Sequence, residues 1–488
     1  MGKAMEQDLR VGKKEILVVL LTIVVLGSLY FYNLGGWLID DDEGSFLYQA
    51  WRISAGERPY ADFFSSRDPL FLYTTGLLVK LLGRSISALR AVPVLLILAS
   101  GAVVFSLARR FLPAEGAWLT MLVFLLHPQI FFYGRRMYPE PFMLFFIVLG
   151  LYLFERGWDE RRYWLLAGAG LSFGVATLYK LLGLVSLGGC LLWAMVDAWQ
   201  QRPGWRSWIV RAVAVLVPFG LLVSFSFLGF MYWEPAFYSS VIGVNLAQGR
   251  ELSRGQVVFN GIVFLLGYTL RYLPLMVFAL PAAWTSRRED GRTILIAWQL
   301  PVVLAFLFLH RDLFLRHLFY LVPSLAILFA LALEPLRRWP GRSFLLVAVI
   351  GAILLPWALE DAVRAMQTEN DTARITELIR SQTGAEAYVI SDYQELNFHA
   401  ARRSTYLGAE ISQVVVEGGE KITGAQLIEE IKENPVQMVI LDVSPDMAHQ
   451  LKNLVDYEQF HSYIQENFAL LGQFPRAGQL LEIYVRGE

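Results

Sequence analysis

The chain has 488 residues and a formal net charge of −1, and 56% of its residues are hydrophobic while only 17% are charged. Soluble globular domains carry about 25% charged residues, so this composition excludes a soluble globule and indicates a polytopic membrane protein. The near-neutral charge argues against a nucleic-acid partner, and the single cysteine, Cys190, excludes a disulfide framework and a cysteine-based metal site.

The first long apolar run extends from Ile16 to Leu38. It predicts a retained transmembrane helix, because it can cross ~30 Å of hydrocarbon and has no small-residue cleavage site of a signal peptide after it. Four acidic residues, Asp40-Asp41-Asp42-Glu43, follow this run at once. Carboxylates at a membrane edge are costly, so the cluster is a functional-site hypothesis. The alternative is an ordinary solvated N-cap of a helix.

Two short helices are predicted after the acids. The segment GSFLYQAWRIS at 44–54 has apolar residues at helical spacing, which predicts an amphipathic helix along the interface. The segment at 69–83 predicts an apolar helix too short for a comfortable span. Adjacent residues on a helix point about 100° apart, so we expect Asp42 and Glu43 to do different jobs. A carboxylate partly removed from water can have a raised pKa, which suits a general base.

Apolar windows predict eleven transmembrane spans, and six basic clusters all fall on one side if eleven spans are drawn. The clusters are Lys13/Lys14, Arg109/Arg110, Arg156 with Arg161/Arg162, Arg202 with Arg206 and Arg211, Arg287/Arg288 with Arg292, and Arg337/Arg338 with Arg342. The positive-inside rule makes that side cytoplasmic. We therefore expect a cytoplasmic N-terminus, with the loop at 39–85 and the residues after 358 on the outer face. The windows are 16–38, 86–107, 114–133, 139–155, 163–179, 181–198, 208–230, 258–284, 292–310, 314–333 and 343–358.

The residues after 358 predict a small soluble α/β domain, because helical and strand patterns alternate there. We expect helices at 372–381, 424–433 and 455–468, and strands at 387–390, 437–441 and 480–485. This divides the chain into a transmembrane catalytic domain, 1–358, and an extracytoplasmic domain, 359–488. Asp392 and Asp442 each follow a strand, where an acid can be catalytic, but we expect ordinary turn and cap acids there.

Three blocks of the chain together resemble one family. The segment 41–95, with the Asp42-Glu43 pair, GERPYADF and a basic residue before Asp68-Pro69-Leu70, is similar to the first outer loop of GT-C glycosyltransferases of the protein O-mannosyltransferase and aminoarabinose transferase type. The segments 133–153 and 308–328 resemble two further blocks of that family. The resemblance spans roughly residues 16–358, and the motifs are specific only as a set.

The resemblance implies a polytopic α-helical GT-C fold and a glycosyl-transfer reaction. Such an enzyme moves a sugar from a polyprenyl-phosphate donor to a protein, lipid or glycan acceptor on the extracytoplasmic face, with inversion. It implies that Asp42 is the catalytic carboxylate, Glu43 its neighbour and Glu140 the acid of the second outer loop. A divalent metal held by Asp42, Glu43 and Glu140 is an open alternative.

The resemblance also implies basic residues that bind the donor phosphate. Arg67 stands where the family often has a lysine, and its planar fork of donors suits phosphate. Arg136, Lys180, Arg316 and His317 are the other candidates. For the arginines outside the first loop the alternative is snorkelling to lipid headgroups, and for Arg67 it is a pair with Asp62 or Asp68 that holds the loop.

Two other classes of function stay open at this point. A secondary transporter would show internal repeats and broken helices in matching halves, and the sequence shows neither pattern. A polysaccharide ligase or polymerase would use a lipid-linked donor, but its acid pair should not stand at the end of the first span.

Overall fold

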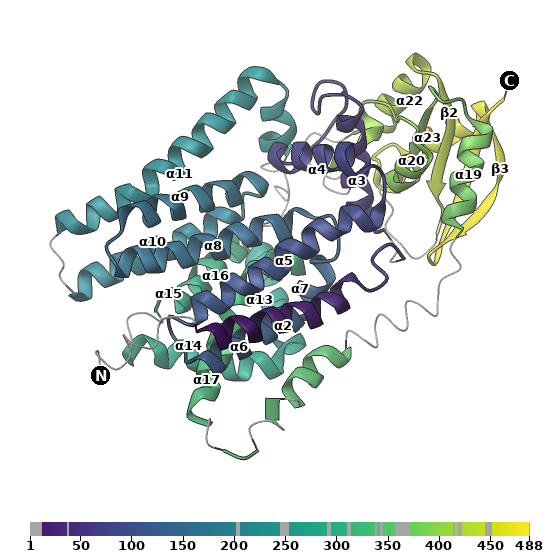
Figure 1. Cartoon of the computed structure of the whole chain (residues 1–488). Coiled ribbons are helices and arrows are strands. Elements are labelled where there is room, and N and C mark those ends of the chain that lie inside the picture. The colour runs from purple at the N-terminus through teal and green to yellow at the C-terminus, as the bar shows by residue number, and fades with distance from the viewer. Residues whose placement is uncertain are drawn as a thin grey trace. The chain divides into compact units, whose positions relative to one another are not determined.

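The computed structural model covers the whole chain (Figure 1). It describes residues 12–36, 39–201, 205–244, 253–289, 294–309, 314–336, 339–341, 345–346, 348–356, 371–412, 415–416, 422–444 and 451–487. The chain forms two compact units. We call Met1–Leu34, Arg90–Phe227 and Leu252–Leu359 the helical unit, and Gly35–Leu89, Leu228–Glu251 and Glu360–Glu488 the mixed unit.

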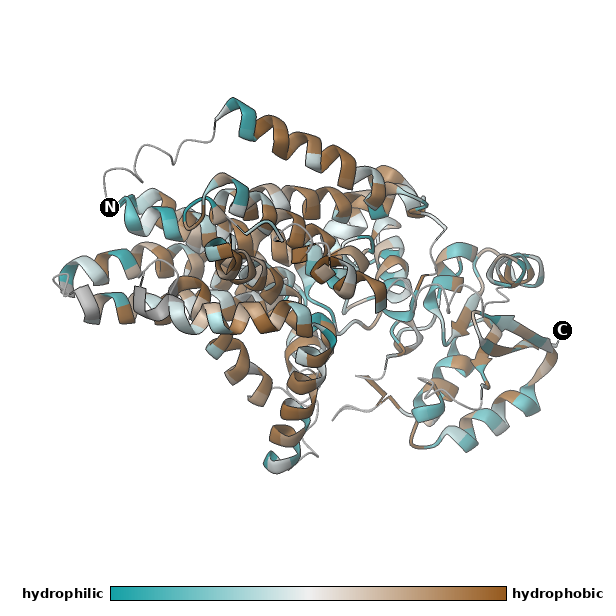
Figure 2. Ribbon diagram, turned by 90° about the horizontal axis from the view of Figure 1, so that it is seen from below, coloured by the Kyte–Doolittle hydropathy of each residue, from teal (hydrophilic) through white to brown (hydrophobic). Residues whose placement is uncertain are grey.

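The helical unit consists of apolar helices, and Figure 2 shows hydrophobic residues along most of their length. The helix α8 lies against α9, and α14 against α17. Two of the helices, α5 and α11, continue into the mixed unit. The helices are α2 (Lys13–Phe31), α5 (Ile86–Ala108), α6 (Ala114–Leu126), α7 (Pro128–Tyr133), α8 (Pro139–Asp159), α9 (Tyr163–Tyr179), α10 (Gly183–Gln201), α11 (Trp205–Trp233), α13 (Arg254–Arg271), α14 (Leu273–Glu289), α15 (Ile294–Ala297), α16 (Gln299–Leu309), η2 (Leu315–Leu321), α17 (Val322–Leu333) and η3 (Glu334–Leu336).

Five helices of the described residues are long and apolar enough to cross a membrane, or six if α13 and α14 form one bent span. The predicted windows 114–133, 163–179, 181–198 and 292–310 fall instead on shorter apolar helices. In α11 only 6% of the apolar window is buried within the protein, which is the pattern of a helix that faces lipid. The chain is therefore an integral membrane protein.

Several predicted spans differ from the observed helices. The first helix ends at Phe31 rather than Leu38, because the chain turns at 32–36, where Asn33 has a φ of 49°. The window 258–284 is not one straight helix, since the chain bends by 108° between α13 and α14, which form either one broken span or a re-entrant pair. Pro274 lies in the first turn of α14, where its missing backbone N–H costs no helical hydrogen bond, so it favours the start of a new helix at this break. Pro128 divides α6 from α7 for the same reason. The window 343–358 lies partly outside the described residues.

The first part of the mixed unit contains the two predicted short helices, α3 (Asp41–Ser54) and α4 (Pro69–Leu82), and a π-helix, η1 (Tyr238–Gly243). Asp40 is the N-cap of α3, because its Oδ1 accepts the backbone N–H of Glu43 at 2.9 Å. The helices α3 and α4 pack closely at Gly76, where a Cβ atom would lie 2.5 Å from a methyl carbon of Ile53.

The C-terminal part of the mixed unit is an α/β domain around a sheet with the strand order β1-β2-β4-β3. Strands β1 and β2 are parallel, and the other two pairs are antiparallel. Successive residues of β2 face opposite sides, so Ile440 packs with α19 and α20 while Val439 packs with α22 and α23. The elements are α19 (Thr372–Gln382), β1 (Tyr388–Ser391), α20 (Gln394–Ala400), η4 (Leu407–Ala409), α22 (Gly424–Glu433), β2 (Val436–Asp442), η5 (Leu451–Asn453), α23 (Tyr457–Asn467), β3 (Phe468–Arg476) and β4 (Gln479–Arg486).

All three predicted helices and all three predicted strands of this domain are present, with shifts of one or two residues at most ends. Four elements among the described residues of this domain were not predicted: the helix α20, the strand β3 and the short 3₁₀ helices η4 and η5. The strand β3 begins at Phe468, where we expected the preceding helix to end, and a tight turn at Ala477-Gly478 joins it to β4. Both turn residues have positive φ, as a two-residue hairpin turn of this kind requires. The predicted boundary at 358–359 lies outside the described residues.

Candidate active site

In the mixed unit, the candidate site begins at the N-terminus of α3. Asp42 lies in the first turn, and its side chain is 30% exposed. Ser45 and Gln49 follow one and two turns later on the same face of the helix, and both are buried. Gln49 donates from Nε2 to the hydroxyl of Ser45 at 3.1 Å. A polar stripe therefore runs from the partly exposed Asp42 into the interior of the unit.

Glu43 has a different environment from Asp42. It is fully buried, and so are Phe46, Leu47 and Ala50, which share its helix face. The two neighbouring acids thus belong to opposite surroundings, one open to water and one in the core. That the two acids do different jobs stays a prediction, and Asp42 is the member of the pair that is open to solvent.

Arg67 connects the loop before α4 to two carboxylates. Its Nη2 lies 3.4 Å from Oδ1 of Asp42, and its Nε lies 3.0 Å from Oε1 of Glu410. The guanidinium also stacks over the ring of Phe46, with 5.0 Å to the ring centroid. Asp62, which we considered as a partner of Arg67, instead accepts the backbone N–H of Arg58 at 2.7 Å. Arg67 is therefore held beside Asp42.

Glu410 was not predicted as a site residue, although it is fully buried at the centre of this network. Its carboxylate accepts from the backbone N–H of Ser66 at 2.7 Å, from the Ser66 hydroxyl at 2.5 Å and from Nε2 of Gln49 at 3.2 Å. The Ser65 hydroxyl donates to Oε1 of Gln49 at 2.8 Å. Glu410 stands 344 residues after Ser66 in the sequence, so no local pattern could reveal the contact.

Further contacts fix α3 to the C-terminal domain. Arg52 donates to the carbonyl of Ser404 at 3.1 Å, and the backbone N–H of Ser404 donates to the hydroxyl of Tyr48 at 2.6 Å. At Gly44 a Cβ atom would lie 3.0 Å from Cβ of Glu395, so the helix approaches α20 as closely as a glycine allows. The N-terminus of α3 is therefore built into this domain.

A cluster of titratable groups surrounds that junction. Arg476 pairs with Glu395 at 2.8 Å and donates to the carbonyl of Ile39 at 3.3 Å. Burial raises the pKa of Asp41 to about 6, although the charge of Arg476 opposes this. Burial likewise raises the pKa of Glu395 to about 7 against the effect of Arg476. These acids can take up protons near neutral pH.

Asp392 and Asp442 have the structural role that we expected. Asp392 accepts the backbone N–H groups of Asp442 at 2.9 Å and Leu451 at 3.0 Å. Asp442 accepts the backbone N–H and the hydroxyl of Ser444, and the hydroxyl of Tyr393. Burial raises the pKa of Asp392 to about 7, while its two backbone donors lower it. Both acids stabilise turns at the ends of β1 and β2.

The helical unit holds the other predicted site residues. Glu140 is fully buried in the first turn of α8, and Lys180 follows the last residue of α9. Their side chains form an ion pair of 2.5 Å between Nζ and Oε1. An acid at a helix N-terminus and a base at a helix C-terminus both complement the helix dipole. The structure therefore brings these two candidates together.

Arg136 lies in the turn between α7 and α8, three residues before the start of α8 at Pro139. Its side chain is buried, with the guanidinium 3.7 Å from the centroid of the Phe132 ring. Arg135 is also buried and donates to the carbonyl of Tyr32. Neither arginine extends to the surface of the unit, which is contrary to the snorkelling alternative.

Arg316 and His317 lie on η2, which packs against α7 and α8. The Arg316 guanidinium stands 4.7 Å from the centroid of Phe314. His317 is buried, and its Nδ1 accepts the backbone N–H of Phe314 at 3.3 Å. His317 therefore has a local role in closing the turn before η2, whereas Arg316 is partly exposed.

A metal centre is not found where the sequence suggested one. Within the described ranges, no three or more His, Cys, Asp or Glu side chains are grouped in a way that could hold a metal ion. Of the three proposed ligands, Asp42 pairs with Arg67 and Glu140 pairs with Lys180. Both acids therefore have cationic partners in this structure, and the metal site stays a prediction from the sequence.

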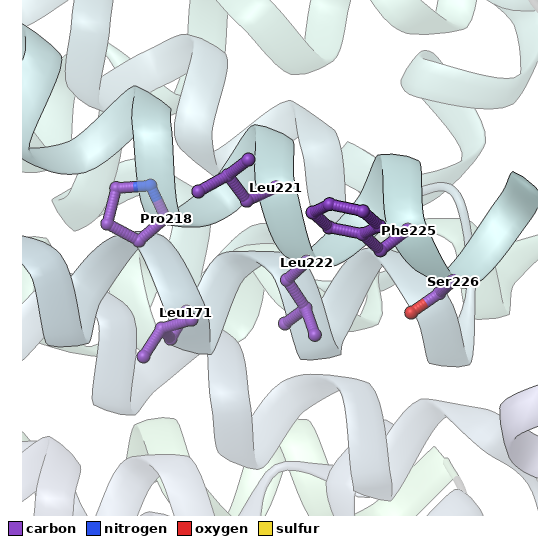
Figure 3. A pocket seen from close by; sticks show the side chains of 6 residues that line it. All are labelled: Leu171, Pro218, Leu221, Leu222, Phe225 and Ser226. Atoms are coloured by element: carbon purple, nitrogen blue, oxygen red, sulfur yellow. The ribbon is translucent and has the colours of Figure 1, made fainter. Parts of the chain in front are cut away.

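An apolar groove crosses the surface of the helical unit between α9 and α11 (Figure 3). It has a volume of about 560 Å³ and is lined by Leu171, Pro218, Leu221, Leu222, Phe225 and Ser226. Leu171, Leu221 and Phe225 are each about half exposed or more. A groove lined in this way suits a hydrocarbon chain.

Comparison with known proteins finds a family model that matches part of the chain and solved structures that share its fold. Residues 66–233 match the family model described as dolichyl-phosphate-mannose-protein mannosyltransferase. The structure is similar to ArnT from Cupriavidus metallidurans in the apo state, with 16% sequence identity and a TM-score of 0.66 over 95% of this chain and 97% of that chain. A comparison with curated protein sequences gave no match.

Two further structures share the fold. ArnT from Cupriavidus metallidurans bound to undecaprenyl phosphate has 16% identity and a TM-score of 0.63, over 96% of this chain and 97% of that chain. The oligosaccharyltransferase AglB from Archaeoglobus fulgidus, in complex with an inhibitory peptide and a dolichol-phosphate, has 11% identity and a TM-score of 0.59, over 98% of this chain and 74% of that chain.

Proposed function

We propose that the chain is a membrane glycosyltransferase of the GT-C type, which moves a sugar from a polyprenyl-phosphate donor to an acceptor on the extracytoplasmic face. The family-model match at residues 66–233 and the fold shared with ArnT support this proposal. The acceptor is a protein, a lipid or a glycan that offers a hydroxyl or an amine. The reaction is a single in-line displacement, which inverts the anomeric centre.

The observation that carries this proposal is the pair formed by Asp42 and Arg67. The carboxylate of Asp42 is partly exposed and lies 3.4 Å from the guanidinium of Arg67, which follows the buried residues Ser65 and Ser66. The reaction needs these two groups, a base that takes the proton of the acceptor and a cation that stabilises the departing phosphate. We assign the first task to Asp42 and the second to Arg67.

The residues of the helical unit have supporting roles in the proposal. We propose that Lys180, Arg136, Arg316 and His317 supply further positive charge or hydrogen bonds for the donor phosphate, and that Glu140 keeps Lys180 oriented. The apolar groove between α9 and α11 provides a surface for part of the polyprenyl chain. Each role follows from the chemistry of the side chain.

A transfer assay with purified protein tests the proposal. The enzyme in lipid nanodiscs should transfer the sugar of a polyprenyl-phosphate mannose or aminoarabinose donor. Asp42→Asn should lower turnover by a general-base factor on the order of 10²–10⁴ while donor binding stays nearly intact. Asp62→Asn, in an exposed acid of the same loop, is the control and should keep wild-type turnover.

Two results would overturn the assignment. Near-normal turnover of a folded Asp42→Asn variant would remove Asp42 as the base. If the wild type gave solute flux in liposomes but no transfer from any polyprenyl-phosphate sugar, the transporter interpretation would replace the transferase.

A further inference from the structure

We propose that the C-terminal α/β domain completes the active site and that Glu410 is the positioning residue through which it acts. In this view, Glu410 holds Arg67 beside Asp42 and sets the charge that Asp42 experiences. The catalytic consequence rests on the function proposed above, whereas the positioning itself can be measured without activity.

The partners of the Glu410 carboxylate lie outside the C-terminal domain to which it belongs. This residue follows η4, yet its partners Gln49, Ser66 and Arg67 all belong to the first outer loop and its helices. Its carboxylate receives three hydrogen bonds at 2.5–3.2 Å besides the ion pair with Arg67. An acid that served only the stability of its own domain would have partners there.

The burial of the Glu410 carboxylate carries a free-energy cost that its partners must offset. Glu410 is 0% exposed, and a buried carboxylate is strongly unfavourable unless cations and hydrogen-bond donors compensate it. The guanidinium of Arg67 and the backbone N–H of Ser66 compensate the charge of Glu410. The position of the Arg67 backbone and the place of its guanidinium are therefore fixed by the same carboxylate.

The charge of Glu410 also acts on Asp42 through Arg67. Arg67 lies between two carboxylates, with Nε 3.0 Å from Glu410 and Nη2 3.4 Å from Asp42. The Nε–H is not aligned for a hydrogen bond, so its contact with Glu410 is mainly Coulombic. A negative Glu410 shares the charge of Arg67 and leaves Asp42 less stabilised as an anion. Asp42 is then a stronger base than it would be beside Arg67 alone.

The test replaces the charge but keeps the shape. Glu410→Gln can still accept the hydrogen bond of Ser66, but it no longer neutralises Arg67. We expect kcat/KM for the donor to fall about tenfold, because Arg67 loses the ion pair that holds it in position. Tenfold corresponds to the loss of one charged interaction. We also expect the acidic limb of the kcat–pH profile to move to lower pH, because Arg67 then stabilises ionised Asp42 more fully. Glu410→Asp keeps the charge and should leave this limb in place.

Glu430 provides the matched control. It is a partly buried acid of the same domain whose carboxylate accepts the backbone N–H of Leu407 at 3.0 and 3.2 Å, within the domain. Glu430→Gln should leave the pH profile and the donor KM unchanged. If Glu430→Gln and Glu410→Gln moved both quantities equally, Glu410 would have no special role and the proposal would be wrong.

Hydrogen exchange gives a readout that does not need activity. Glu410→Ala removes the acceptor of the Ser66 N–H, so we expect faster amide exchange over 63–68, while Glu430→Ala should leave this segment unchanged. Unchanged exchange in a folded Glu410→Ala protein would overturn the positioning role.

The two proposals can fail separately. If the wild type transfers sugar and Glu410→Gln keeps the wild-type profile and kcat/KM, the role of Glu410 fails and the function stands. If the wild type transfers nothing, the function fails, and the exchange experiment decides alone whether Glu410 holds Arg67 in place.

Discussion

At the scale of single residues, the helix phase separates acids that are adjacent in the sequence. Asp40 caps α3, Asp42 is partly exposed and Glu43 is buried, although all stand within one turn. Only the position with both solvent access and a neighbouring cation combines the features of a general base at a phosphate site. The role of an acid here depends on its surroundings rather than on its presence in the cluster.

The buried acids of the mixed unit predict a dependence of stability on pH. The pKa of Asp41 is raised to about 6 and that of Asp392 to about 7, both chiefly by burial, whereas unfolded aspartate titrates near 4. A raised carboxyl pKa contributes stability at low pH that is lost as the pH rises through the folded pKa. Each unit of difference is worth roughly 1.4 kcal/mol.

We therefore expect the C-terminal domain within the full-length protein to unfold at a higher temperature at pH 5 than at pH 8. Thermal melts in the same detergent at the two pH values measure this. Asp41→Asn should reduce the difference, because the side chain at that position then no longer titrates. A higher melting temperature at pH 8 would contradict the burial effect.

At the scale of elements, the local patterns in the sequence predicted most of the fold but not the long-range contacts. The helix α3 and the strands β1, β2 and β4 carry clear periodicity, and the structure contains them. The helix α20 has only 7 residues, which is too short for a periodic signal, and β3 lacks a regular alternation of buried and exposed residues.

The candidate site was predictable to the same extent. Asp42, Glu140, Arg67 and Lys180 stand in or next to motifs and helix ends, and the structure pairs Asp42 with Arg67 and Glu140 with Lys180. Glu410 follows a short turn of the tail and has no motif. Glu410 stands out only because of its tertiary contacts, and a single sequence does not show which distant residues are in contact.

Close helix packing in the helical unit predicts the effect of a small substitution. A Cβ atom at Gly170 of α9 would overlap the carbonyl oxygen of Val215 in α11, and a backbone atom cannot move aside as a flexible side chain can. Gly170→Ala should therefore destabilise the protein by about 1–3 kcal/mol, as overpacking does.

The matched control is Gly220→Ala in α11, since no atom lies within 4 Å of a Cβ there. This variant should be neutral or slightly stabilised, because alanine favours a helix over glycine by up to about 1 kcal/mol. Thermal denaturation of both variants in one detergent measures the difference. Equal melting temperatures would show that α9 and α11 can separate at this position without cost.

At the scale of the whole molecule, ion pairs gather several basic clusters at one end of the helical unit. Arg109 pairs with Glu15 at 3.6 Å, and Arg110 pairs with Glu155 at 2.6 Å and with Asp159 at 2.7 Å. The start of α2 and the ends of α5 and α8 therefore share one end. Glu140 stands at the other end of α8, so it is separated from these clusters by the length of a spanning helix.

This arrangement leads to a prediction about orientation. Basic residues near span ends favour the cytoplasmic side, so reporter fusions after Arg110 and Arg162 should report the cytoplasm. Fusions after Ser66 and Glu488 should report the outer face, because both positions belong to the mixed unit that holds the acidic cluster. Fusions to alkaline phosphatase and to a fluorescent protein that folds in the cytoplasm give opposite signals. At each position, one reporter therefore serves as the control for the other. If the fusion after Ser66 reported the outer face and the one after Glu488 reported the cytoplasm, a membrane would separate Glu410 from Arg67, and the network of the mixed unit could not exist.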